Sequence, residues 1–341
     1  MEQVQSLADF LGKHPRTIEI LPGEIDLWVP ESISAHPFLF AEGNLGVPQK
    51  VLYKAYMVAI RAYLNLRNES RKAGPSLQQS NLLDRLTRVI LLANPSHQTA
   101  LNSRKKLIEN SVVDPCWELN FSGSLLSCRE CTKESILWHH RRWLLHVIHE
   151  VPATVGTDTI PETIPPNALE AEFACASVAC HLYPRNYHAW THRRFCAEAL
   201  QLKVPSNPVV LVEEYQKTLK WIESHISDYS AMNYATNFQK MLPGREPTQE
   251  LLSTEEHVTS LLRAFPDHES LWMYLRGSVT LEGEKELLAS MKTLPSARKF
   301  ALRHMVWRKI SGGEEVPLGS LRDVLACDSS LEEFEQLVSL G

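Results

Sequence analysis

No apolar run in this sequence is long enough to cross a bilayer. The longest runs are short, such as 89–93, whereas a membrane-spanning helix needs about 20 consecutive apolar residues. The first residues lack the basic and apolar regions of a secretory signal peptide, and residues 338–341 are not a prenylation box. We therefore expect a cytoplasmic protein that has no transmembrane segment and is not itself a lipid-carrying substrate.

Basic residues are not in excess either. The 341 residues include 35 lysines and arginines against 40 aspartates and glutamates, which gives a formal net charge of −5. A nucleic-acid-binding protein would usually present a basic face, so nucleic acid is not the expected ligand. Hydrophobic residues make up 44% of the chain, which is ordinary for a globular protein and sufficient for a sizeable core.

Recognisable catalytic and metal-binding motifs are missing as well. The seven cysteines are scattered and odd in number, which indicates a reducing compartment. Cys128 and Cys131 form a lone Cys-x-x-Cys pair, and His139 and His140 point apart on a helix, so we predict no metal site. A phosphate loop, an HExxH motif and a Gly-x-Ser-x-Gly motif are absent, which argues against a self-contained enzyme.

What the sequence does contain is a recurring Trp-x-x-Arg signature. Its clearest copy runs from Pro184 to Arg193, and a degenerate last copy follows Pro295. The residues assigned to the tryptophan position are Leu101, Trp138, Trp190, Tyr234 and Trp272, which lie 37, 52, 44 and 38 residues apart. These spacings are typical of helix–turn–helix repeats, with one insertion in the longest interval.

The segments before each signature show helical periodicity. They are 82–92, 117–128, 168–182, 209–226 and 249–265, and no stretch shows sustained alternation, so we predict an all-α protein. Residues 1–80 are expected to hold an irregular segment at 17–46 and a capping helix at 53–66. The repeats are expected to occupy 81–311, with a proline-rich insertion at 151–166, and closing helices to occupy 312–341.

The residue types of the signature favour a structural role. Asn186 stands where an N-cap belongs, so its side chain can accept from free backbone donors. Trp138 and Arg141, like Trp190 and Arg193, are three residues apart and share one helix face. The tryptophans, Trp272 included, are expected to fill the groove within a helix pair, and the arginines to reach carbonyls or carboxylates of a neighbouring helix.

The segments 186–194, 137–143 and 269–277 resemble the α-subunit repeats of protein prenyltransferases. The resemblance covers about five repeats within 81–277, and the residue spacing of tetratricopeptide repeats is absent. It implies a right-handed superhelix, or crescent, of helix pairs around a catalytic β subunit. That β subunit would hold a zinc ion and the isoprenoid diphosphate, so this chain itself is expected to bind no cofactor.

The resemblance further implies a non-autonomous α subunit that forms a heterodimer. The degenerate copies and the insertion fit a divergent member best. Such a member would pair with a Rab-type β subunit and transfer a geranylgeranyl group to C-terminal cysteines of proteins such as SNAREs. The alternative is a helical-repeat scaffold that binds a protein partner and takes no part in catalysis.

The resemblance also suggests where chemistry would occur. The family places a lysine before the Asn-Tyr of the third repeat, near the diphosphate leaving group, and Arg185 stands there in this sequence. Tyr187 and His188 would lie at the same edge, and Asn233 and Tyr234 at the matching edge of the next repeat. The alternatives are that Arg185 lies on a solvated turn and that the other residues cap and pack helices.

Overall fold

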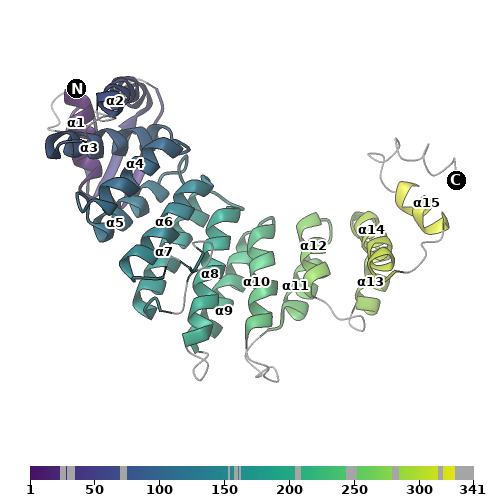
Figure 1. Ribbon diagram of the computed structural model, residues 1–341. Coiled ribbons are helices and arrows are strands. Elements are labelled where there is room, and N and C mark those ends of the chain that lie inside the picture. The colour runs from purple at the N-terminus through teal and green to yellow at the C-terminus, as the bar shows by residue number, and fades with distance from the viewer. Residues whose placement is uncertain are drawn as a thin grey trace. The chain divides into compact units, whose positions relative to one another are not determined.

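The computed structural model describes residues 1–23, 28, 35–69, 75–152, 154–156, 160, 163–203, 209–242, 252–278, 284–313 and 318–326. Helices predominate in these residues, as the sequence predicts (Figure 1). The chain divides into two compact units, Met1–Lys203 and Val204–Gly341. The handedness predicted for the array stays a prediction.

The first unit consists of an N-terminal part and three helix pairs. Its elements are α1 (Glu2–Leu11), β1 (Thr17–Leu21), β2 (Leu39–Ala41), β3 (Asn44–Pro48), α2 (Gln49–Glu69), α3 (Leu77–Ala93), α4 (Gln98–Glu109), α5 (Pro115–Leu126), α6 (Ser135–Ile148), α7 (Pro166–Leu182) and α8 (Tyr187–Lys203). The pairs α3–α4, α5–α6 and α7–α8 each form one repeat (Figure 1).

The second unit continues the same alternation of helices. Its elements are α9 (Val209–Ser224), α10 (Tyr229–Met241), α11 (Thr254–Ala264), α12 (Glu269–Ser278), α13 (Glu284–Lys292), α14 (Pro295–Ser311) and α15 (Leu318–Ala326). One closing helix, α15, follows the last pair, and the remainder of the closing segment predicted at 312–341 lies largely outside the described residues.

The N-terminal segment differs from the sequence prediction. Residues 17–46 were expected to be irregular, but β1 pairs in parallel with β3, and β2 pairs with β3 in antiparallel register. The pattern that could have predicted β1 covers only a few residues. Ile18 and Leu21 are buried, whereas Thr17 and Glu19 are exposed. Five residues of partial alternation are typical of a strand, but they are too few to stand out within a helical chain.

The tryptophan position of the signature lies in the core of each helix pair. Leu101, Trp138, Trp190 and Trp272 are all buried. The indole nitrogen of Trp138 donates to the carbonyl oxygen of Thr132 at 2.8 Å, and that of Trp272 donates to Pro266 at 3.0 Å. Each indole thus satisfies a carbonyl six residues earlier, in the turn that precedes its helix. This is the packing role that the sequence predicts, with an additional hydrogen bond at the turn.

The fourth repeat is out of register with the sequence prediction. The backbone N–H of Leu101, Trp190 and Met232 donates to the residue four positions earlier, which is the N-cap of the helix in each case. Met232, buried in α10, therefore takes the tryptophan position, and Tyr234 lies two residues beyond it. The assignment of Tyr234 to that position was wrong because it followed aromatic identity, whereas the capping residue Asp228 sets the register.

Candidate functional edge

The turn before α8 exposes the residue that the sequence analysis singled out. Arg185 is exposed, and its backbone φ is +62°, a left-handed conformation that is uncommon outside glycine. The next residue, Asn186, is buried. Its side-chain oxygen accepts from the backbone N–H of Ala189 at 3.1 Å, so Asn186 is the N-cap of α8.

Asn186 also connects this turn to the previous repeat. Its amide nitrogen donates to the carbonyl oxygen of Thr132 at 3.0 Å and to the hydroxyl of Thr132 at 3.1 Å. The same carbonyl accepts the indole N–H of Trp138. The position of Arg185 is therefore set by a buried hydrogen-bond network that spans two repeats, although Arg185 itself lies at the surface.

Tyr187 and His188 extend the exposed edge along the first turn of α8. Tyr187 is 67% exposed, and its ring lies 5.4 Å from that of His188 in an edge-on arrangement. Burial lowers the pKa of His188, and the positive charge of Arg142 acts in the same direction against the opposing effect of Glu134. Arg142 and Arg185 thus make this edge basic, with a half-buried imidazole beside an exposed tyrosine.

The two candidates from the next repeat lie in different environments. Asn233 is exposed on α10, and its carbonyl oxygen accepts from the amide nitrogen of Asn237 at 2.9 Å. Tyr234 is buried, and its hydroxyl donates to a carboxylate oxygen of Glu214 at 2.9 Å. A substrate or partner can reach Asn233 directly, whereas Tyr234 is enclosed within its helix pair.

The arginines of the signature bind neighbouring helices, as their planar geometry predicts. Arg141 on α6 donates from Nε and Nη2 to both carboxylate oxygens of Glu172 on α7, at 2.5 Å and 2.7 Å. Arg193 donates to the carbonyl oxygen of Phe173 at 3.3 Å and to the hydroxyl of Ser177 at 2.6 Å. These contacts are structural, because they are buried and directed into the repeat.

The carboxylates that these arginines meet were not predicted from the sequence. His192 lies two residues after Trp190, and its Nε2 is 2.8 Å from Glu172, which Arg141 also binds. Burial raises the pKa of Glu172, but Arg141 and His192 outweigh that effect and lower the pKa to about 2. Glu172 shares the buried face of α7 with Leu169 and lies on an apolar stripe, which is the signal that could have revealed it.

The contact between the first and second repeats has the same arrangement, in which one buried glutamate binds an arginine and a histidine. Arg104 on α4 donates to Glu118 on α5, and the Nε2 of His140 on α6 lies 3.0 Å from the same carboxylate. Burial raises the pKa of Glu118, but these partners lower it to about 2. In both junctions the arginine comes from the preceding repeat and the histidine from the second helix of the same pair. Each carboxylate therefore joins two successive repeats.

A second recurring contact joins the second helices of successive repeats. Lys105 Nζ lies 4.9 Å from the centroid of the Trp143 ring, and Arg142 Cζ lies 5.3 Å from that of Phe195. In the second unit, Arg276 Cζ lies 4.7 Å from that of Trp307. In each case a cation at one repeat stacks on an aromatic ring of the next. These contacts are inter-repeat packing interactions worth about 0.5–1 kcal/mol each at partly exposed sites.

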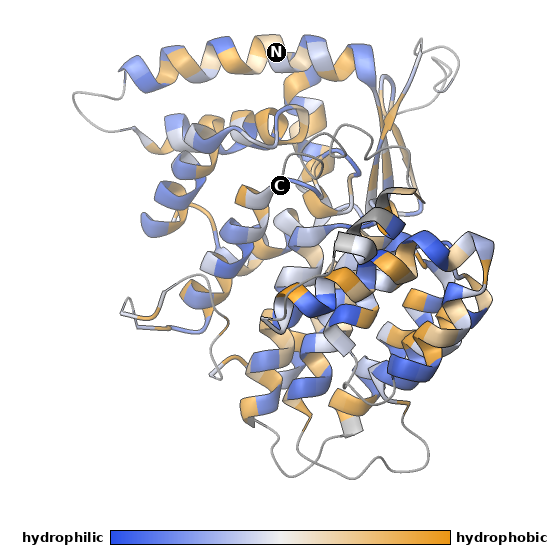
Figure 2. Cartoon of the chain, turned by 90° about the vertical axis from the view of Figure 1, so that its right-hand side faces the viewer, coloured by the Kyte–Doolittle hydropathy of each residue, from blue (hydrophilic) through white to orange (hydrophobic). Residues whose placement is uncertain are grey.

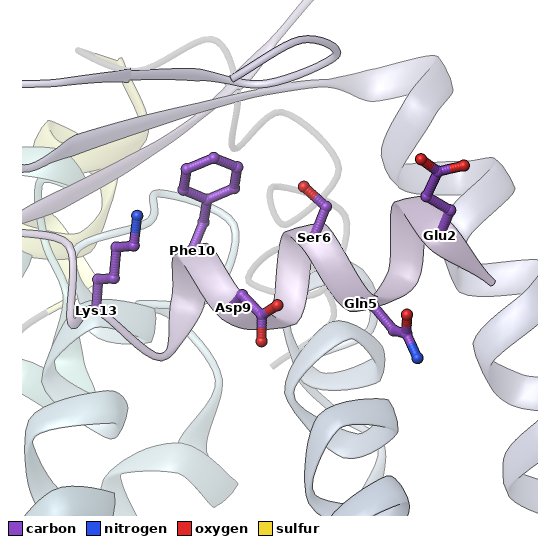
Figure 3. A pocket seen from close by; sticks show the side chains of 6 residues that line it. All are labelled: Glu2, Gln5, Ser6, Asp9, Phe10 and Lys13. Atoms are coloured by element: carbon purple, nitrogen blue, oxygen red, sulfur yellow. The ribbon is translucent and has the colours of Figure 1, made fainter. Parts of the chain in front are cut away.

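Within the described residues, no group of three histidine, cysteine or acidic side chains could hold a metal ion. Nor does any helix in this part of the chain have the length and apolar character needed to cross a bilayer. One cavity of about 440 Å³ lies between α5, α7 and the turn at His14, and is lined in part by Asn120, Ser124 and Cys175. A shallower hollow of about 300 Å³ runs along α1 beside Phe10 (Figure 3). Neither includes a candidate residue from the sequence analysis.

Comparison with known proteins identifies relatives of this helix-pair array. Residues 169–200, which cover most of α7 and α8, match the family described as protein prenyltransferase alpha subunit repeat. The chain is 27% identical over 278 residues to protein prenyltransferase alpha subunit repeat-containing protein 1 of Danio rerio, covering 70% of this chain and 63% of that protein. The Homo sapiens protein of the same name is 29% identical over 242 residues, 59% of each chain.

A relative whose name states an activity is matched over a smaller share of its own length. The chain is 31% identical over 223 residues to geranylgeranyl transferase type-2 subunit alpha of Bos taurus, covering 61% of this chain and 35% of that subunit. The matched part is thus less than two thirds of the length of each of these relatives. The match at 169–200 contains Arg185, Tyr187 and His188, so the exposed edge lies inside the shared repeat.

Proposed function

Because this chain carries the repeat of protein prenyltransferase α subunits, we propose that it is the non-autonomous α subunit of a cytoplasmic protein geranylgeranyltransferase. Its partner would be a zinc-containing β subunit of the Rab type, which holds the geranylgeranyl diphosphate. The substrates would be proteins with C-terminal cysteines, such as SNAREs. Similarity to a geranylgeranyl transferase α subunit supports the lipid class.

The observation that carries this proposal is the exposed basic edge at the start of α8. Arg185 and Arg142 place positive charge beside Tyr187 and His188, on a turn that Asn186 fixes through buried hydrogen bonds. A diphosphate leaving group develops negative charge as the bond to the isoprenoid carbon breaks. A pre-positioned guanidinium can stabilise that charge through paired hydrogen bonds. The zinc of the partner would supply the activated cysteine thiolate.

In this role Arg185 would contact the leaving group, whereas Asn186 would act only by positioning it. Tyr187 and His188 would border the path of the protein substrate or of the partner. Asn233 would offer a further exposed polar contact in the next repeat. Tyr234 would act through the packing of α9 against α10, since its side chain is enclosed.

The test is reconstitution with each class of prenyltransferase β subunit. The purified chain should form a stable complex with one of them, and the complex should transfer labelled geranylgeranyl groups to cysteine-tailed proteins. The chain alone should be inactive. A chain that binds none of the β subunits would refute the transferase proposal and favour the alternative, a scaffold that presents its repeats to another protein. Complex formation without transfer to any cysteine-tailed protein would also favour the scaffold.

A further inference from the structure

Helix α2 exposes more large apolar side chains than any other helix among the described residues. Tyr53, Met57, Val58 and Leu64 are all at least 36% exposed, and each of the other described helices contributes at most two such residues. Monomeric proteins rarely leave such a group uncovered without a binding role. Figure 2 shows α2 along the upper edge of the first unit, with hydrophobic and hydrophilic residues alternating along it.

Three of the exposed apolar residues form a stripe on one side of the helix. Met57 follows Tyr53 by four residues, and Leu64 follows Met57 by seven. Because these spacings correspond to about one and two helical turns, the three side chains share one face. The opposite side, which includes Ala55, Ala59 and Tyr63, is buried against the rest of the unit. The exposed stripe is therefore distinct from the buried face with which α2 packs against the rest of the unit.

The charge beside the stripe has one predominant sign. Lys54, Arg61 and Arg67 are exposed on α2, the first turn carries no acidic residue, and Glu69 in the last turn is the helix's one acidic residue. The chain as a whole is acidic, with a net charge of −5, so this local excess of positive charge contrasts with the overall composition. An apolar stripe beside basic side chains with long aliphatic stems suits a surface that is apolar below and anionic above.

We propose that the exposed face of α2 binds the surface of an anionic phospholipid bilayer. The stripe would enter the boundary between headgroups and acyl chains, and Lys54 and Arg61 would contact lipid phosphates. The face runs along a 21-residue helix of about 30 Å, and three cavities of the first unit, beside α1, α3, α5 and α7, include no residue of α2. An apolar helix face could also enter the groove of a protein partner, but the excess of basic side chains beside the stripe matches an anionic bilayer surface. This binding does not depend on the proposed transferase activity.

The test is co-sedimentation of the full chain with lipid vesicles. The protein should bind vesicles of phosphatidylcholine with about 30% phosphatidylserine, should bind phosphatidylcholine alone much more weakly, and should dissociate as salt is raised. The double variant Lys54→Gln/Arg61→Gln should partition about thirtyfold more weakly, since each basic residue near an anionic surface contributes about fivefold. The double variant Met57→Asp/Leu64→Asp should abolish binding.

Matched controls are available in the same unit. Val178 and Leu202 are exposed apolar residues on other helices, so Val178→Asp/Leu202→Asp should bind as the wild type does, and so should Lys106→Gln. Circular dichroism should show the same melting transition for all variants. Failure of the wild type to bind anionic vesicles would overturn the proposal, as would equal binding by the α2 variants and controls. Loss of β-subunit binding in the α2 variants with unchanged vesicle binding would assign this face to a protein partner instead.

Discussion

In the first unit, buried carboxylates join each repeat to the next, whereas in the second unit the buried carboxylates Glu214 and Glu284 meet residues of their own helix pair. The carboxylates of the second unit that do reach the next pair, Glu223 and Glu269, are exposed. Glu172 binds Arg141 of the preceding repeat and His192 of its own. In the second unit, Glu214 accepts from Tyr234, and Glu284 meets His304 and Arg308, all within one pair. The residue two positions after the tryptophan position is a histidine in the second and third repeats and a tyrosine in the fourth, and in each it contacts a carboxylate of its own pair.

The arginine position accounts for the difference between the units. It is occupied by Arg104 and Arg141 in the first two repeats, but by Ala235 and Leu275 in the fourth and fifth. The fifth and sixth repeats are joined by the buried ring contacts of Trp272 with Phe300 and His304, and the ion pair between them, Glu269 with Arg303, is partly exposed. A buried charge network demands that every partner be present, whereas an apolar junction tolerates substitution. The repeats of the first unit should therefore depend more strongly on single polar residues.

The largest effect is expected from Glu172→Ala. This change leaves Arg141 and His192 buried without their carboxylate, which should lower the free energy of unfolding by about 3–5 kcal/mol. The matched change in the second unit, Glu284→Ala, should cost less because Arg308 is 26% exposed and can be hydrated. Urea unfolding followed by tryptophan fluorescence measures both losses. Equal losses would contradict the proposed difference between the units.

Acid should weaken the first unit through the same networks. The pKa values of Glu118 and Glu172 fall from 4.5 to about 2 on folding, so their contribution to stability is complete above about pH 4.5 and is lost as the pH falls toward 2. Burial also lowers the pKa values of His140 and His192 below 6.5. The unfolded state therefore takes up protons first as the pH falls below 6.5, and stability declines there too.

The melting temperature measured between about pH 7.5 and about pH 4 checks this dependence. The variant His140→Asn/His192→Asn should be less stable than the wild type at pH 7 but should show a smaller decline just below pH 6.5. An unchanged slope in that range would mean that these two histidines are not the groups that titrate.

Asn186→Ala should have an intermediate effect. It removes the N-cap of α8 and the two hydrogen bonds to Thr132, which should cost about 1–2 kcal/mol. Asp228→Ala in the second unit removes a cap that accepts from Ser230 and Ala231 and provides the matched comparison. In the reconstituted enzyme, Asn186→Ala should also slow transfer because it releases the turn that holds Arg185, whereas Asp228→Ala should leave the rate closer to that of the wild type.

The smallest effects are expected from the cation–aromatic contacts. Trp143→Leu and Phe195→Leu each remove a ring on which a cation of the previous repeat stacks, and Trp307→Leu does so in the second unit. Beyond the lost apolar packing, the cation contact itself should contribute about 0.5–1 kcal/mol in either unit. Double-mutant cycles with Lys105→Met, Arg142→Met and Arg276→Met isolate that contribution. A coupling energy near zero in all three cycles would mean that these contacts do not stabilise the packing of successive repeats.

The sequence predicted the helix pairs because their apolar periodicity is long and regular. The buried positions of Trp138 and Trp190 and the capping role of Asn186 followed from residue type and spacing. The carboxylates did not follow, because a glutamate on a helix is usually exposed. Glu118 and Glu172 are recognisable only by their place on the buried face. The predicted register of the fourth repeat was wrong because Tyr234 resembles tryptophan more closely than Met232 does.

The position of the candidate edge was predictable from the sequence, but the contacts that hold it in place were not. Arg185 stands out by its place before Asn186, and the structure adds its left-handed backbone, its exposure and the nearby charge of Arg142. A long-range partner such as Thr132, 54 residues from Asn186, leaves no local pattern in the sequence. Contacts between successive repeats are set by packing, which single-sequence periodicity does not encode.

The central claim is that the signature builds the array and that the exposed edge beside it supports catalysis. The most direct measurement is the rate of geranylgeranyl transfer by the reconstituted complex carrying Arg185→Ala. The matched control is Arg129→Ala, an exposed arginine in the turn of the preceding repeat. Arg185→Ala should lower kcat about tenfold or more without weakening the complex, Arg185→Lys should restore most of the rate, and the control should be unaffected. An unchanged kcat for Arg185→Ala would contradict the claim and return Arg185 to an ordinary surface turn.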